Sequence, residues 1–173
     1  MMFNNEHYFL DLQTFENIQS LLTGAWFPWF FNDKIVGENE TPNPIVNDID
    51  IFDFQFTHTF FQENDESVSF KHIKPLFDKI DPKKLLRVKA NLLTPALEQI
   101  QTPFHTDLED TTGVKTAIFY VNTNNGFTVF EDGTRISSIE NRLIIFDGNI
   151  LHAGTNCTNQ KNRCVININF IEK

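Results

Sequence analysis

The segment TPFHTDLED, residues 102–110, carries the first side chains whose types and spacing could do chemistry. His105 and Asp107 stand two residues apart in it. On an extended strand, residues i and i+2 point to the same side, so an imidazole and a carboxylate would lie side by side while Thr106 points away. Such a pair can grip a metal ion but cannot complete its site. Without a further ligand, it is equally well read as a polar strand end.

His152, in GNILHAGTN, is the best candidate for the missing ligand. It follows an apolar strand and a glycine-containing turn, although a histidine there is also compatible with an ordinary loop. Two histidines and one carboxylate on one side of a metal leave the other coordination positions open. This is the arrangement of non-haem iron(II) oxygenases.

Arg163, in KNRCVIN, opens the last predicted strand. The planar fork of a guanidinium holds a carboxylate through two hydrogen bonds. A 2-oxoglutarate cosubstrate needs such an anchor for its far carboxylate. Lys161 stands two residues earlier, in a polar stretch typical of a loop, and is a rival anchor.

The elements that must position these side chains change in character along the chain. Apolar residues at helical spacing predict helices at residues 11–23 and 69–80. The aromatic run GAWFPWFFND favours a covered strand beside the core over an exposed aromatic patch, and residues 51–61 alternate as a strand. His58 in that strand is predicted to be a hydrogen-bonded core histidine.

Short strands follow after residue 82, with a hairpin signal at Asp132-Gly133. We therefore expect an α+β, mainly β chain: a β-sandwich or open barrel with helices packed on one sheet. The length suits one domain over residues 1–173, with a β core at 83–171 and N-terminal support at 1–82.

Strand alternation sorts the polar residues of this core into faces. Arg87, Lys89 and Asn91 share one face, which either lines the mouth of the barrel or is a solvated surface. Asn167 and Asn169 share the face of Arg163 on the last strand. Inward polar groups are costly unless they meet water, ligand or each other, so we assign Asn167 to the active site. Cys164 is expected to point away from Arg163, outside the barrel.

Composition excludes some classes of function. The formal net charge of −9 repels phosphate backbones, which makes a nucleic-acid partner unlikely. No apolar run is long enough to span a bilayer, and the N-terminus lacks a secretory pattern. The two cysteines favour reduced, packed thiols in a cytoplasm over a disulfide framework. We therefore expect a cytoplasmic protein, of a bacterium or a phage-infected host, without membrane partners.

The motifs HTD, AIFYVN, NGFTVFEDG, RLIIFDGNILHAG and RCVININF occur in this order over residues 86–171. In them the chain resembles the 2-oxoglutarate- and iron(II)-dependent dioxygenases, specifically the prolyl-4-hydroxylase-like branch. It is most similar to small single-domain members found in phages and marine bacteria, in which FPWFF and RVKANL also have counterparts. The spacing between His152 and Arg163 is slightly longer than the commonest one in the family, which is why Lys161 stays a rival anchor.

The resemblance implies a double-stranded β-helix with His105, Asp107 and His152 as the catalytic iron ligands. It implies Arg163 as the 2-oxoglutarate anchor, with the hydroxyl of Tyr120 on the same carboxylate. We add Asn167 and Asn91 to the candidates for cosubstrate binding. The expected cofactors are Fe(II) and 2-oxoglutarate, with ascorbate as a further candidate.

The resemblance further implies a hydroxylase that uses O2 on an unactivated C–H bond and yields succinate and CO2. Asp107 favours hydroxylation over halogenation, because the related halogenases lack that carboxylate. The substrate is left open between a protein side chain such as proline and a small molecule, since the substrate-binding segments of prolyl hydroxylases have no counterpart here. The alternative is a non-catalytic metal-binding β-barrel module, or a virion or partner-binding protein.

Overall fold

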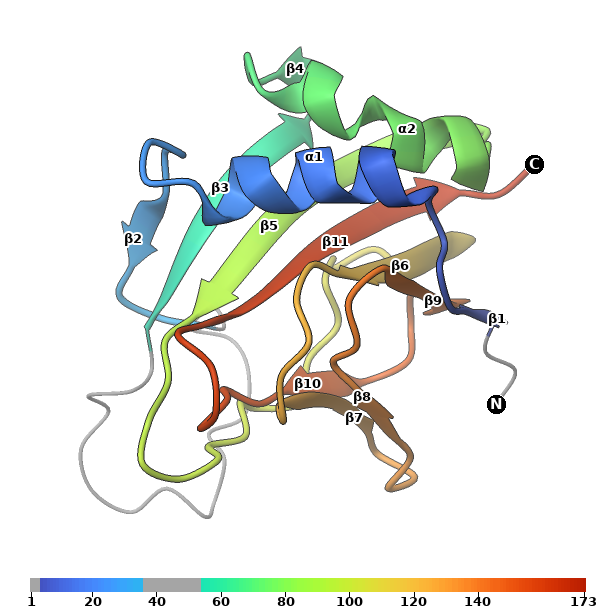
Figure 1. The fold of residues 1–173 in the computed structure, drawn as a ribbon. Coiled ribbons are helices and arrows are strands. Elements are labelled where there is room, and N and C mark those ends of the chain that lie inside the picture. Colours follow the sequence, from blue (N-terminus) through green and yellow to red (C-terminus); the bar gives the residue numbers. More distant parts are fainter. Residues whose placement is uncertain (1–3, 36–53) are drawn as a thin grey trace.

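The computed structural model describes residues 4–35 and 54–173 (Figure 1). Its helices are α1 (Leu12–Thr23) and α2 (Phe70–Ile80). Its strands are β1 (Asn4–Glu6), β2 (Phe30–Asn32), β3 (Gln55–Gln62), β4 (Asp65–Glu66), β5 (Lys84–Leu93), β6 (Val114–Tyr120), β7 (Phe127–Phe130), β8 (Arg135–Ser137), β9 (Arg142–Asp147), β10 (His152–Gly154) and β11 (Arg163–Ile171).

Both predicted helices are confirmed, and a side-chain cap explains where α1 begins. The carboxylate of Asp11 accepts a hydrogen bond of 3.0 Å from the backbone N–H of Thr14, which caps the first turn of α1. Gly24 ends that helix. Neither helix in the described part of the chain is long and apolar enough to cross a membrane. Each helix buries an apolar face, formed by Phe15, Ile18 and Leu22 in α1 and by Phe70, Ile73, Leu76 and Phe77 in α2.

Two antiparallel sheets hold the strands. The larger sheet has eight strands in the order β1-β9-β6-β11-β5-β3-β2, with β4 paired to β3. The smaller has the order β10-β7-β8. Bridges from Gln101 to Thr155 and from His105 to His152 lay the segment 101–105 along β10. The hairpin predicted at Asp132-Gly133 joins β7 to β8 and is confirmed.

The larger sheet is covered on both faces. Figure 1 shows α1 and α2 lying across one face and the smaller sheet facing the other. The helix side buries Phe15, Ile18 and Leu22 of α1 against alternate residues of the central strands. Each such side chain contributes about 1.5–3 kcal/mol through its burial. A second apolar cluster lies between the two sheets, and its members are Ile118, Tyr120, Phe130, Ile144, Phe146 and Val165.

The prediction of a covered strand in the aromatic run is wrong. β2 is an edge strand that pairs only with β3 among the described strands. Phe30 and Phe31 are each 62% exposed, and Trp26 is 98% exposed. Only Phe27 and Trp29 of this run pack into the helix-side core. A dense run of aromatic residues therefore does not by itself indicate burial on both faces.

Cys164 lies on the helix side of β11, as its place in the alternation predicts. Burial raises the pKa of its thiol to about 12, so the thiolate is scarce at neutral pH. Cys164→Ala should turn over 2-oxoglutarate at nearly the wild-type rate and lose on the order of 1 kcal/mol of stability. Steady-state assays with thermal unfolding check this. A large loss of rate at unchanged stability would contradict it.

Candidate active site

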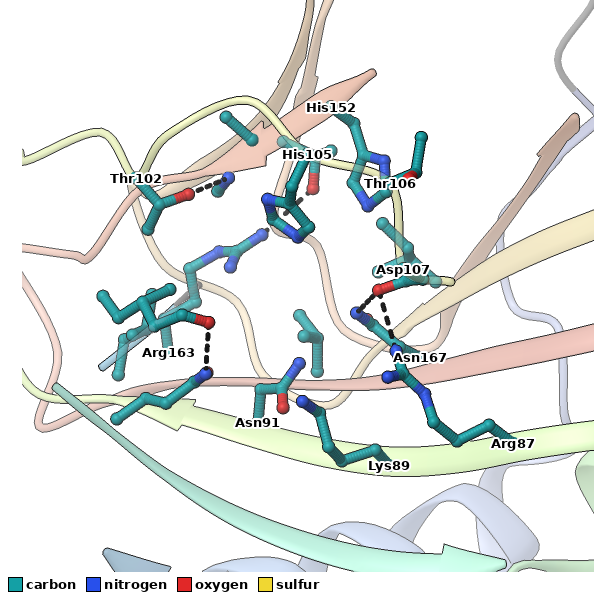
Figure 2. Close-up of a pocket in the computed structure, with 18 residues that line it drawn as sticks. Arg87, Lys89, Asn91, Thr102, His105, Thr106, Asp107, His152, Arg163 and Asn167 are labelled. Carbon is teal, nitrogen blue, oxygen red and sulfur yellow. Dashed lines mark hydrogen bonds and ion pairs between the residues drawn. The ribbon is translucent and has the colours of Figure 1, made fainter. Parts of the chain in front are cut away.

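The two candidate ligand histidines face each other across a backbone pair. The backbone N–H of His105 donates to the backbone carbonyl of His152, and the backbone N–H of His152 donates to the backbone carbonyl of His105. Each hydrogen bond is 3.0 Å long. A pair that exchanges both bonds places its side chains on the same side of the ladder. The ring centroids are accordingly 4.9 Å apart (Figure 2). β10 is thus the element that brings His152, distant in sequence, beside His105.

The hydrogen bonds of the rings fix their tautomers. Nδ1 of His105 lies 3.0 Å from the carbonyl oxygen of Pro103, and Nδ1 of His152 lies 3.2 Å from that of Ile150. A carbonyl oxygen can only accept, so in the neutral form of both rings we assign the proton to Nδ1. Nε2 is then the ring nitrogen that carries the lone pair with which each histidine can bind a metal. Nε2 of His152 is buried and has no partner among the described residues.

Asp107 completes a set of three ligand atoms that lie within 4.8 Å of one another. Burial alone would raise the pKa of its carboxyl group, but His152 and Arg87 outweigh this and lower the pKa to about 2. Arg87 forms an ion pair of 3.1 Å with Oδ1. The side-chain amides of Asn167 and Asn169 donate to Oδ1 and Oδ2 over 3.3 and 3.0 Å. The carboxylate is therefore ionised and held from three sides.

A cavity of about 180 Å³ opens between the two sheets at these residues. Arg87, Lys89 and Asn91 line it, so the face that they share on β5 belongs to the cavity and not to a solvated surface. Thr106 also lines it, against the expectation that this residue points away. The strand geometry assumed there ends at the bridge of His105, and the chain bends at residues 107–109.

Arg163 lies at the other end of the cavity lining and is almost fully buried. Its Nε donates to the hydroxyl of Ser138 over 2.8 Å, and one terminal nitrogen donates to Thr128 Oγ1 over 3.1 Å. It forms no ion pair with a carboxylate of the described residues. Desolvation lowers the pKa of its guanidinium, partly offset by Tyr120. A buried cation without a counter-ion suits a site for an anion.

The rival anchor and the candidate tyrosine lie outside the cavity lining. Lys161 is exposed in the loop before β11. Tyr120 is fully buried in the cluster between the sheets, and its hydroxyl donates to Thr128 Oγ1 over 2.9 Å. Thr128 thus links Tyr120 to Arg163, a connection that the sequence did not indicate. Thr128 and Ser138 lie on and after the hairpin β7–β8, and no spacing pattern identified them.

Gly126 makes room for the arginine. A methyl group on this residue would lie 2.6 Å from Cδ of Arg163 and 2.7 Å from the carbonyl oxygen of Asn156. We expect Gly126→Ala to cost about 1–3 kcal/mol of stability and to weaken 2-oxoglutarate binding by displacing Arg163. The control is Gly133→Ala, whose methyl group meets nothing within 4 Å but is strained at φ +84°. The control should lose stability without a change in 2-oxoglutarate KM, and equal KM values in both variants would contradict the role of Gly126.

The remaining histidines of the chain lie outside the cavity. The prediction for His58 is confirmed, because its ring nitrogens lie 2.9 Å from the carbonyl oxygen of Pro28 and 3.1 Å from the hydroxyl of Ser67. His7 and His72 are exposed. Of the described histidines, only His105 and His152 line the cavity, where they are grouped with Asp107 as candidate metal ligands.

Several solved structures share the arrangement of helices and strands found in this chain. An oxidoreductase of the 2OG-Fe(II) oxygenase family from Burkholderia pseudomallei matches with a TM-score of 0.64 and 8% identity, covering 97% of this chain and 84% of the other. SnoN, a non-heme alpha ketoglutarate dependent epimerase from nogalamycin biosynthesis, matches with a TM-score of 0.62 and 13% identity, covering 98% and 77%. A prolyl hydroxylase from Trichoplax adhaerens, in complex with a hypoxia inducible factor peptide fragment, matches with a TM-score of 0.60 and 13% identity, covering 98% and 83%.

The chain has the fold of the 2-oxoglutarate- and iron(II)-dependent oxygenases, prolyl hydroxylases among them. The resemblance seen in the sequence motifs is thereby confirmed at the level of the fold. No protein-family model and no curated protein matches the sequence. The oxygenase fold therefore rests on the arrangement of the elements, and the roles of individual residues rest on the geometry of this site.

Proposed function

We propose that the protein is an Fe(II)- and 2-oxoglutarate-dependent hydroxylase. One observation carries the proposal. The set of His105, Asp107 and His152 faces the same cavity as Arg163, a buried guanidinium without a carboxylate partner in the described part of the chain. A metal site kept only for stability would have no use for that second feature. We further propose that the two sheets form the double-stranded β-helix that the sequence resemblance implies.

The donor atoms fit iron(II). Two imidazole nitrogens and one carboxylate, on one side of a metal, form the facial triad of non-haem iron oxygenases. Both histidines have an Nδ1 hydrogen bond that orients the ring, as metal-bound histidines commonly do. The pKa of about 2 means that Asp107 needs no deprotonation at neutral pH before it binds a cation.

The far end of the cavity fits the second carboxylate of 2-oxoglutarate. Arg163 is held by hydrogen bonds to Ser138 and Thr128, so its fork is oriented before any ligand arrives. We propose Arg163 as the anchor and Tyr120, through Thr128, as the group that helps to position it. Asn91 and Asn167 line the cavity between the two ends.

The residues of the chain then divide the work. Iron and 2-oxoglutarate, when bound, supply the activation of O2: one oxygen atom enters the substrate C–H bond, the other enters succinate, and CO2 leaves. Asp107, His105 and His152 hold the metal, and Arg163 orients the cosubstrate. The apolar cluster between the sheets excludes water from one wall of the site. Which C–H bond is hydroxylated depends on the rest of the cavity.

The proposal is tested by turnover. Protein loaded with iron(II) under air should convert 2-oxoglutarate into succinate, and mixtures of metabolites and peptides should yield a product that is one oxygen atom heavier. Mass spectrometry of both products measures this. Succinate formation no faster than in a metal-free control, across all mixtures, would favour the non-catalytic binding module.

A further inference from the structure

The cavity has the opposite charge to the protein as a whole. The formal net charge of the chain is −9. Yet the described residues that line the cavity include three cations, Arg87, Lys89 and Arg163, and only one carboxylate, Asp107. An acidic protein that keeps a basic cavity is built to hold anionic groups there. The proposed function uses some of these cations but not all of them.

Lys89 is the cation of the cavity lining to which the proposed function assigns no role. Arg87 is paired with Asp107, and Arg163 suits the far carboxylate of 2-oxoglutarate. Lys89 has no ion pair and no hydrogen bond with any described residue. Desolvation, and then the neighbouring charge of Arg87, lower the pKa of its ammonium group. A half-buried ammonium group that has no partner among the described residues costs stability, and binding of a ligand would be a functional reason for keeping it.

The position of Lys89 puts it near the metal ligands. Lys89 pairs across the sheet with Asn167, whose side-chain amide donates to Asp107. Figure 2 shows the ammonium end of Lys89 pointing into the cavity beside Asn91, on the same side as Asp107, while Arg163 lies across the cavity. The charge of Asp107 accordingly acts on Lys89. A group bound by Lys89 would therefore lie close to the reacting centre.

Two oxygen atoms near Lys89 lack a donor. Oδ1 of Asn167 and Oδ1 of Asn91 are buried and have no partner among the described residues. The amide of Asn167 cannot simply be reversed, because its nitrogen donates to a carboxylate oxygen that can only accept. Buried acceptors of this kind call for N–H or O–H donors on a ligand. The cavity thus offers a cation that can bind an anionic group of a ligand. Next to this cation it offers oxygen atoms that can accept hydrogen bonds from the ligand.

We infer that the substrate is a free amino acid, with its carboxylate on Lys89 and its amino group on Oδ1 of Asn167 and Asn91. This inference rests on the proposed function and specifies its substrate class. A zwitterion matches the paired cation and acceptors, whereas a residue inside a peptide chain has neither the free carboxylate nor the free ammonium group. Because Asn167 also touches Asp107, an amino acid held there keeps its side chain within reach of the metal.

The test uses the iron-loaded protein with a pool of the proteinogenic L-amino acids and a matched pool of their C-terminal amides. The free amino acids should stimulate succinate formation and gain one oxygen atom, and the amides should do neither. For the stimulating amino acid, Lys89→Met should raise KM about 10- to 100-fold, as loss of a charge-assisted hydrogen bond does. Lys89→Arg should retain much of the binding, and Lys84→Met, at the exposed end of the same strand, should behave as wild type.

A second readout separates this inference from the proposed function. Binding of 2-oxoglutarate to the iron-loaded protein, followed anaerobically without an amino acid, should change less than about threefold in Lys89→Met. If 2-oxoglutarate binds normally but no amino acid stimulates turnover, or the amides work equally well, the substrate class is wrong and the oxygenase stands. If Lys89→Met weakens 2-oxoglutarate itself, Lys89 belongs to the cosubstrate site and the inference is overturned.

Stability gives a further check that does not depend on turnover. Methionine is close to lysine in length and carries no charge, so Lys89→Met should raise the melting temperature of the metal-free protein. Lys84→Met should leave it unchanged. A fall in melting temperature with Lys89→Met would show that the ammonium group is structural and would contradict a role in substrate binding.

Discussion

Asp107→Ala is expected to lower 2-oxoglutarate turnover at least about 1000-fold, which corresponds to about 4 kcal/mol of barrier. Asp107 supplies the only carboxylate of the proposed ligand set, and its loss leaves the metal with two imidazoles. Its loss also removes the partner of Arg87 and the acceptor of two asparagine amides. His105→Ala and His152→Ala should lower turnover to a similar extent, measured as succinate release.

The fold should survive these changes, because the three side chains lie outside both apolar clusters. Circular dichroism and thermal unfolding are therefore measured beside activity. Glu109→Ala is the matched control, since this acid is exposed two residues after Asp107 and lies outside the cavity lining. Substantial turnover in any one of the three ligand variants would remove that residue from the proposed site.

Arg163→Met is expected to raise the apparent KM for 2-oxoglutarate about 30- to 1000-fold. This is the effect of losing a charge-assisted hydrogen bond to a buried carboxylate, which costs about 2–4 kcal/mol. Iron binding should be retained, because Arg163 is not one of the three grouped ligands. Lys161→Met should change the same KM less than about threefold, because its ammonium group is exposed. Initial rates over a range of 2-oxoglutarate concentrations measure both values.

Arg163→Lys distinguishes charge from shape. A lysine keeps the cation but gives only a point charge in place of the fork, so its KM should fall between those of wild type and Arg163→Met. The reverse ranking, with Lys161→Met the more damaged variant, would show that the loop lysine is the anchor. It would leave the proposed metal ligands untouched.

The parts of the fold that depend on local pattern could be predicted from the sequence. Helical spacing located α1, and the dipeptide Asp132-Gly133 located the hairpin between β7 and β8. Alternation on β11 separated Cys164, which packs under the helices, from Arg163 and Asn167, which line the cavity. In each case the signal lies within a few residues of the element that it predicts.

The parts that depend on distant neighbours could not be predicted. β10 has three residues, too few to show any alternation, and exists because it pairs with β7 and with the segment of His105. The ion pair between Arg87 and Asp107 depends on a bend at residues 107–109, and no pattern in the sequence indicates this bend. The same holds for Thr128, which meets Arg163 only because the smaller sheet folds over the larger.

The most direct test of the central claim is the anaerobic absorption spectrum of the protein with iron(II) and 2-oxoglutarate. Chelation of iron by the cosubstrate at the proposed site should produce a weak band near the middle of the visible range. The band should be absent in Asp107→Ala and His152→Ala, and should need far more 2-oxoglutarate to form in Arg163→Met. A wild-type protein that gives no band, while binding iron(II), would contradict the account and favour a metal-binding module without this chemistry.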